Sequence, residues 1–350
     1  MKRFFLNLVY ICVLIRLFCC CSIGGIPGSA ENEEIIERYE KYEAETNVSD
    51  PESLLFLVGK MVSETEINFE FSQPVKVVSL VFDPILTVGS MEEGATITVH
   101  LEEYLEPGTS FVAELLVENE WGNSISVLVP LRSRNNRVPE LLINELRTVY
   151  SSSQSRVEFI EFRIKTAGNL GALRVFAASN NRNPMIYQFL PVEVKAGERV
   201  VLHLRTLHDS SRDEYGENLA ESSGTDSSPT ARDFWISGSN RLLRNTDGVY
   251  VLDQDDRVLD AVMISETQDL WWSNNYIAEA ADFLFRQGAW KSSTGGICSP
   301  ADAVDTSEIR TAATRSISRD ETAEDTNTAA NWFVTATGGA TPGLPNIPKI

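Results

Sequence analysis

Three adjacent cysteines, Cys19, Cys20 and Cys21, stand out for their chemistry, since reactive thiols are otherwise scarce in this chain. They follow a short apolar stretch, residues 4–15, which has two basic residues before it. An apolar run this short is typical of an export signal, because a membrane-spanning helix needs about 20 apolar residues. The sequence therefore predicts a chain that is exported from the cytoplasm.

The segment Leu17-Phe18-Cys19-Cys20 resembles the cleavage site of a bacterial lipoprotein signal. In that family the cysteine after the cleavage site receives diacylglycerol and becomes the new N-terminus. The resemblance implies a signal peptide over residues 1–20 and a lipid on Cys20, with Cys21 and Cys19 as alternatives. An ordinary secretory signal or an uncleaved anchor remains the simpler alternative. The implied location is the bacterial cell envelope, on the periplasmic face or the outer surface.

Composition excludes several classes of partner. The formal net charge of the 350 residues is −20, and a polyanion is repelled by nucleic-acid phosphates. We therefore expect no nucleic-acid partner, and acyl chains rather than basic residues to hold the protein on a membrane. Four of the five cysteines lie at or before Cys21, so the folded part has only Cys298 and no disulfide framework.

Motifs of catalysis or cofactor binding do not occur. The three histidines, His100, His203 and His208, lie in no zinc-protease or nucleophile-elbow pattern, and no phosphate-binding glycine loop is present. His100 and His203 lie in strand patterns. Cys298 lies in a turn-rich loop without a nearby histidine, which favours an inert buried thiol over a nucleophile. The sequence predicts a protein that is not an enzyme and holds no cofactor.

Two remaining clusters could bind a ligand. Asp253, Asp255 and Asp256 form a compact carboxylate group that could hold calcium, although aspartates equally favour a solvated hairpin turn. Asp209, Asp213 and Glu214 offer a second and weaker carboxylate candidate. The pair Trp271-Trp272 could form a binding surface for a protein or a sugar, or could cover the core of the domain. Trp235 and Trp332 are expected in the core.

The chain then divides by composition into a tether and two β-rich regions. Residues 21–50 are rich in glycine and glutamate, which predicts a flexible acidic tether. Residues 51–132 contain alternating strand patterns over 66–71, 75–82, 96–101, 111–117 and 123–129. The patterns FEFSQPV, LEPGTSF and WGN in this region resemble bacterial immunoglobulin-like domains, which implies a β-sandwich that acts as a spacer or an adhesive module.

A polar link over residues 133–139 precedes the second region. Its segments LINEL at 142–146, VEFIEF at 157–162 and TPGLPN at 341–346 occur in the order found in lamin-tail domains of bacterial secreted proteins. The region 138–346 resembles that family, which implies an immunoglobulin-like β-sandwich. Strands are expected around a tight turn over 190–202 and in a hairpin over 249–260. A polar insertion, residues 208–233, is too long for a hairpin loop and is expected to be a mobile surface excursion.

The sequence therefore predicts an all-β protein, with two immunoglobulin-like β-sandwiches in tandem after a lipoprotein signal peptide. The function that fits is a membrane-tethered, non-enzymatic lipoprotein that acts as a scaffold or as a protein-binding or adhesive module. Its partner would be another envelope protein or a host protein. The alternatives are a module associated with a secreted hydrolase and a nucleic-acid-binding lamin-tail domain.

Overall fold

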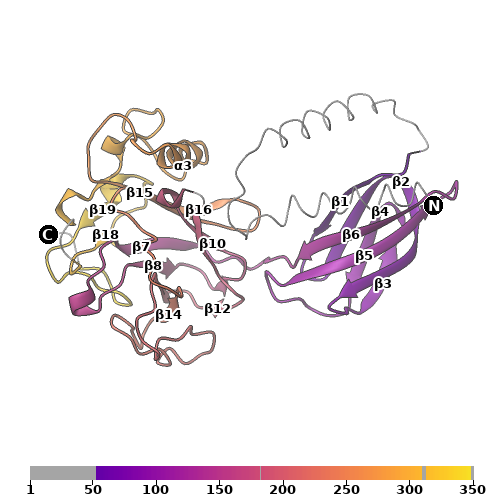
Figure 1. The fold of residues 1–350 in the computed structure, drawn as a ribbon, viewed down its shortest axis with the longest axis horizontal. Helices are drawn as coiled ribbons and strands as arrows, with labels where there is room; N and C mark the ends of the chain where they lie inside the picture. The colour runs from indigo at the N-terminus through magenta and orange to yellow at the C-terminus, as the bar shows by residue number, and fades with distance from the viewer. Residues whose placement is uncertain (1–52, 182, 310–312, 348–350) are drawn as a thin grey trace. The chain divides into compact units, whose positions relative to one another are not determined.

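The computed structural model describes residues 53–181, 183–309 and 313–347 (Figure 1). The predicted signal peptide, the cysteines Cys19, Cys20 and Cys21, and nearly all of the predicted tether lie outside these residues. The described chain is mostly β-strand, so the predicted all-β fold is confirmed. It divides into two compact units, Met1–Leu105 with Thr109–Ser133 and Glu106–Gly108 with Arg134–Ile350.

The first unit is built from six strands around one core. They are β1 (Phe56–Met61), β2 (Glu66–Asp83), β3 (Val88–Glu92), β4 (Gly94–Leu101), β5 (Ser110–Asn119) and β6 (Ser124–Arg132). The strand order is β3-β4-β2-β5-β6, and β1 pairs with β2. Alternate residues along β5 are buried, as expected when one face of a sheet covers a core and the other meets solvent.

The long strand β2 connects the two halves of this unit. Its first half pairs with β1 and β4, and its second half pairs with β5. The sequence patterns predicted two separate strands over 66–71 and 75–82, which is wrong, because the backbone continues through Pro74 as one strand. The β4 ladder shifts between Glu70 and Val75, and a proline without an N–H is tolerated at such an irregularity.

The second unit has two large sheets that enclose a separate core (Figure 1). The six-stranded sheet has the order β14-β13-β8-β7-β18-β19, formed by β14 (Arg232–Trp235), β13 (Arg199–His203), β8 (Phe159–Ile164), β7 (Leu141–Arg147), β18 (Ile317–Arg319) and β19 (Trp332–Val334). The five-stranded sheet has the order β11-β10-β15-β16-β17, formed by β11 (Met185–Gln188), β10 (Arg174–Ala177), β15 (Asp247–Leu252), β16 (Val258–Ser265) and β17 (Val304–Asp305).

Smaller elements complete the second unit. Helix α3 (Asn275–Arg286) buries Ile277, Ala280, Ala281 and Leu284, and Asn274 caps its first turn by accepting a hydrogen bond from the Tyr276 amide. Strands β9 (Gly168–Asn169) and β12 (Glu193–Val194) form a two-stranded sheet. The short 3₁₀ helices are η1 (Ser152–Gln154), η2 (Ala178–Asn180), η3 (Pro300–Asp302), η4 (Ser307–Ile309) and η5 (Ala329–Asn331).

The strand pairings confirm one predicted hairpin and correct another. Strands β15 and β16 pair antiparallel as expected for 249–260. The two strands predicted around the turn in 190–202 exist, but they do not pair with each other. Instead β12 pairs with β9, and β13 pairs with β8 and β14.

The polar insertion, residues 208–233, lies largely at the surface, as its composition predicts, but it also carries buried polar groups and ends in β14. Strands β13 and β14 run parallel, and a parallel pair needs a long crossover connection, which this segment provides. The Glu214 carboxylate is buried and accepts hydrogen bonds from the backbone amides of Glu221, Ser222 and Asp233, at 2.8 to 3.1 Å. Buried polar contacts of this kind order a segment that has few apolar side chains.

We predict that the Glu214→Ala substitution destabilises the second unit by about 2–4 kcal/mol, because it leaves buried backbone amides without an acceptor. Thermal unfolding followed by tryptophan fluorescence measures the change. Glu217→Ala is the matched control, since Glu217 lies in the same segment and makes a surface ion pair with Lys195. We expect the control to leave the melting temperature nearly unchanged. Equal effects of the two substitutions would contradict the structural role of the crossover.

Candidate functional site

Two glutamates face each other across adjacent strands of the six-stranded sheet. Glu145 on β7 is paired in register with Glu161 on β8, and neither side chain is exposed to solvent. The backbone alternation of the two strands places both carboxylates on the same side of the sheet. Two buried carboxylates in register repel each other, so this arrangement persists only if other groups stabilise the charge.

The C-terminal segment, residues 341–346, supplies part of that stabilisation. The Thr341 amide donates to both Glu145 oxygens at 3.1 Å, and the Gly343 amide donates to Glu161 Oε2 at 2.7 Å. The Asn346 amide donates to Glu321 Oε1 at 3.0 Å. We call this segment the C-terminal strap. Its sequence pattern was visible in advance, but its role as a donor of hydrogen bonds to the carboxylates was not predicted.

Side chains from the sheet complete the cluster. Ser316 and Ser318 on and beside β18 donate hydrogen bonds to Glu145. Arg199 on β13 donates to Glu161 at 2.7 Å and also reaches Glu321, which makes one guanidinium shared by two carboxylates. A guanidinium fork is well suited to such sharing, because its N–H groups point in fixed and different directions.

Gly343 is required at the centre of the strap. Its φ angle is +77°, in the left-handed region that favours glycine. A Cβ atom at this position would lie 2.3 Å from the Ser228 Cβ and 2.7 Å from its Oγ. The close approach brings the amide of Gly343 onto Glu161, so any side chain here would move the donor away from the carboxylate.

The buried environment shifts the acidity of the pair. Burial and the nearby Glu145 carboxylate raise the pKa of Glu161 to about 8, against the opposing effect of the Arg199 guanidinium. Burial also raises the pKa of Glu145, against hydrogen bonds from Ser316 and Thr341. Paired carboxylates with raised pKa values occur in acid catalysis, but the strap covers these two completely. The cluster therefore holds the C-terminal strap and presents no surface to a substrate.

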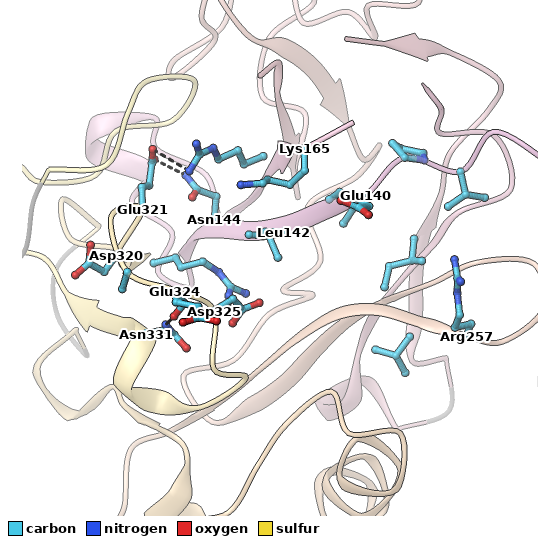
Figure 2. A pocket seen from close by; sticks show the side chains of 18 residues that line it. Glu140, Leu142, Asn144, Lys165, Arg257, Asp320, Glu321, Glu324, Asp325 and Asn331 are labelled. Atoms are coloured by element: carbon cyan, nitrogen blue, oxygen red, sulfur yellow. Dashed lines mark hydrogen bonds and ion pairs between the residues drawn. The ribbon is translucent and has the colours of Figure 1, made fainter. Parts of the chain in front are cut away.

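An open trough borders this cluster and has a volume of about 590 Å³ (Figure 2). Strand β18 pairs with β7 only at Glu145 and Leu146, so the edge of β7 from Leu141 to Ile143 faces the trough rather than a strand. Asn144 and Glu321 line both the trough and the carboxylate cluster.

Each wall of the trough has a distinct character. The floor carries half-buried apolar side chains, Leu142, Val258 and Leu259. The lining carries charged side chains of both signs, and the acidic side chains of the 319–331 loop gather on one part of it (Figure 2). The basic residues are Arg163, Lys165, Arg257 and Arg319, and the acidic residues are Glu140, Asp320, Glu321, Glu324 and Asp325.

Ile143 shows how the adjoining edge of β7 is closed. Its amide donates to Asp260 Oδ2 at 2.6 Å, and its carbonyl accepts from Arg319 Nε at 2.8 Å. Asp260 and Arg319 also form a buried ion pair. Side chains thus satisfy the edge at Ile143, and the trough begins beside it at Leu141 and Leu142. No sequence motif marks this trough, since its lining comes from segments up to 190 residues apart.

The predicted aspartate cluster lies at the tip of the β15–β16 hairpin. Asp253 accepts hydrogen bonds from the amides of Asp255 and Arg257, at 2.9 and 3.0 Å. Asp255 forms an ion pair with Arg134, and Asp256 forms one with Arg174. Among the described residues no group of three or more potential ligands is placed to hold a metal ion. The hairpin-turn interpretation of these aspartates therefore fits the structure better than the calcium interpretation.

In the second predicted carboxylate cluster, Asp213 and Glu214 accept hydrogen bonds from the protein backbone. Asp213 accepts a hydrogen bond from the Trp235 amide at 2.7 Å, and Glu214 accepts the backbone amides described above. Asp209 lies in the turn that opens the crossover. These carboxylates organise the 208–233 segment rather than a ligand.

The two adjacent tryptophans differ in environment. Trp271 is 84% exposed. Trp272 packs against the core of the second unit and donates its indole N–H to the Cys298 carbonyl at 2.7 Å. Trp235 and Trp332 are buried, as predicted. Cys298 is also buried, and burial raises the pKa of its thiol to about 12, which leaves it protonated at neutral pH.

The raised pKa values of buried carboxyl groups predict that the second unit loses stability as pH rises. Glu161 has a folded-state pKa of about 8, and Asp247 and Asp260 have values of about 6. All three lie above the unfolded values, so the folded chain binds more protons between about pH 4.5 and 8, and stability falls across that window. Melting curves at closely spaced pH values, read by tryptophan fluorescence, check the direction.

The Glu161→Gln variant removes the contribution of Glu161 to this pH dependence of stability. We expect its stability to fall less steeply with pH than the parent's, by up to about 1.4 kcal/mol per pH unit between pH 5 and 8. Glu114→Gln, an exposed residue of the first unit, is the control and leaves the slope unchanged. A parent chain whose stability rises steadily from pH 5 to 8 would show that Glu161 is ionised throughout.

Comparison with known proteins identifies a family for this chain, and the matching relative is an uncharacterized protein. Residues 139–334 match the family described as "TP_1001_2nd: protein second domain". An uncharacterized protein of Treponema pallidum (strain Nichols) is 30% identical over 175 residues, which cover 47% of this chain and 43% of that protein. The chain thus spans less than half the length of this relative.

A solved structure from Bacteroides thetaiotaomicron, of a DUF4876 family protein, aligns over 82% of this chain and 90% of its own. It is 10% identical, with a TM-score of 0.27. The fold described above therefore comes from the strand pairings themselves and not from this likeness. The family match spans more than half of the chain and includes β7, β8 and β18, which carry the carboxylate cluster. The chain belongs to the TP_1001 second-domain family.

Proposed function

We propose that this protein is a lipid-anchored, non-enzymatic module of the bacterial cell envelope that binds a segment of another protein in the trough beside β7. The trough carries the proposal. It combines half-buried apolar side chains on its floor with charged side chains of both signs around them, and such a surface can accept an extended polypeptide. The partner would be another envelope protein or a host protein.

The floor and the charges around it give the binding mode. An extended segment lying in the trough would place alternate side chains toward Leu142, Val258 and Leu259 on the floor. The charged rim would select the partner and its direction, because complementary charges contribute more to specificity than to affinity. Lys165 is exposed at the rim, and we assign it the role of pairing with an acidic residue of the partner.

The remaining observations support binding over catalysis. The two buried glutamates are covered by the C-terminal strap, and the Cys298 thiol is buried with a raised pKa. Trp271 is exposed next to the exposed residue Leu270 and offers a second contact surface for a protein partner. Among the described residues no helix is both long and apolar enough to cross a membrane.

The proposed lipid anchor on Cys20 rests on the sequence pattern at residues 17–20.

The trough is tested by photocrosslinking in intact envelopes. A photoreactive amino acid at Lys165 should give a discrete crosslinked product, because this position lies at the rim of the trough. The control places the same amino acid at Lys76, an exposed position of β2 in the first unit. Adding Leu142→Glu to the Lys165 variant should reduce the product about tenfold or more, since it buries a charge on the apolar floor.

Two results would count against the trough. One is an equal product from Lys76 and Lys165, and the other is a product that persists unchanged with Leu142→Glu. Melting curves of the Leu142→Glu variant are needed beside the crosslinking, to show that the second unit is still folded.

The anchor is tested by metabolic labelling with a fatty-acid analogue. We expect the parent chain to be labelled and the Cys20→Ser/Cys21→Ser double variant to lose the label, because Cys20 is the proposed lipid site and Cys21 its alternative. Cys298→Ser is the control and should keep full labelling, since that thiol is buried. Undiminished labelling of the double variant would refute lipidation at these two positions.

A further inference from the structure

A second cavity, separate from the trough, lies between helix α3 and the strand β15. It has a volume of about 230 Å³. Tyr276, Glu279 and Phe283 line it from the helix, and Tyr250 lines it from the sheet. The small residues Ala178 and Ala280 leave room between these elements. No residue of this cavity belongs to the carboxylate cluster or the trough.

The helix presents its three lining residues along one stripe. Tyr276, Glu279 and Phe283 are spaced by three and four residues, so their side chains lie one above another on the same face. The neighbouring residues Ile277, Ala280, Ala281 and Leu284 are buried against the core and set the rotation of the helix. The stripe is therefore held at the mouth of the cavity by the packing of α3.

The aromatic rings form a corner. The Tyr250 and Phe283 rings lie 5.9 Å apart between centroids and are tilted by 53°, so they make two walls rather than a closed stack. Phe176 stacks on Tyr250 at 4.9 Å with an angle of 6° between the planes, which fixes the Tyr250 ring from behind. The Tyr276 ring is 45% exposed and stands at the opening.

The charged residue in the described lining is an acid, Glu279. Glu279 is exposed and forms no ion pair with any other residue that the structure describes. The rings of Tyr250, Tyr276 and Phe283 also line the cavity. Aromatic rings and a carboxylate together attract a cation, because the face of an aromatic ring carries partial negative charge.

We propose that this cavity binds a quaternary ammonium group, such as the trimethylammonium head of choline. A primary ammonium is strongly hydrated and needs several acceptors when it leaves water. A methylated ammonium donates no hydrogen bonds and packs its methyl groups directly on aromatic rings. The cavity offers more ring surface than acceptors, so its chemistry matches the methylated cation.

The experiment is a calorimetric titration of the full-length protein, kept in an alkyl maltoside detergent, with tetramethylammonium and with choline. We expect saturable binding of both. The uncharged analogue 3,3-dimethylbutan-1-ol has the shape of choline without its charge and should bind at least about tenfold more weakly. Methylammonium should also bind more weakly than tetramethylammonium.

Four variants locate the binding in this cavity. Tyr276→Ala removes a ring and Glu279→Gln removes the charge, and each should weaken binding roughly 3- to 30-fold. Tyr276→Phe keeps the ring and should stay within about twofold of the parent. Asp282→Asn is the matched acidic control on the same helix, where Asp282 is paired with Arg286, and should leave affinity unchanged.

The proposal is overturned if neither cation gives saturable binding, or if 3,3-dimethylbutan-1-ol binds as tightly as choline. Equal affinities of the parent, Tyr276→Ala and Glu279→Gln would also overturn it, because binding would then lie elsewhere. Sedimentation with phosphatidylcholine vesicles distinguishes a lipid headgroup from a soluble source of the same group. The comparison is made between the Cys20→Ser/Cys21→Ser variant, which lacks the proposed lipid sites, and the same variant with Tyr276→Ala. Vesicle binding that depends on Tyr276 supports the headgroup, and binding of free choline alone supports a soluble compound.

Discussion

The second unit depends on how two buried glutamates on neighbouring strands are satisfied. Glu145 and Glu161 lie opposite each other with no water to solvate them. Backbone amides of the C-terminal strap, serine hydroxyls beside β18 and the Arg199 guanidinium share the task. These donors come from three separate stretches of the chain. One electrostatic requirement thus brings together β7, β8, β13, β18 and the strap.

The same cluster shapes the trough that we propose as the binding site. Asn144 donates to Glu161 and Glu321, and both of these carboxylates accept hydrogen bonds from the strap and from Arg199. The wall of the trough formed by Asn144 and Glu321 is therefore as rigid as the buried cluster behind it. A preorganised wall reduces the entropy that a partner loses on binding.

Sequence patterns predicted the parts of the fold that local alternation determines. Alternate apolar residues identified β4, β5, β6, β8 and the β15–β16 hairpin, because one face of each strand pair is buried. The pairing of β12 with β9 and the parallel pairing of β13 with β14 were not visible, since both depend on partners distant along the chain. The sequence analysis predicted strands throughout the second region and did not predict helix α3.

Composition predicts the exposed residues of the 208–233 segment but not its buried polar contacts. Low apolar content predicts disorder only if polar groups have no buried partners. Here Glu214 and Arg232 replace an apolar core with a hydrogen-bonded one, and composition alone does not reveal such pairs. The trough was invisible for a similar reason, because its lining residues are brought together only by the completed sheets. The motif segments around Glu145, Glu161 and Gly343 were recognised in order, while their mutual contacts required the structure.

The C-terminal strap has a consequence for the time at which the protein can fold. Thr341 donates to Glu145 across a separation of 196 residues, and Gly343 donates to Glu161 across 182. Until residues 341–346 have been synthesised, the two carboxylates lack these donors, and contacts this distant along the chain form slowly. A nascent chain that stops before Thr341 would therefore hold an incomplete second unit. Synthesis of the strap is then the step that lets this unit close.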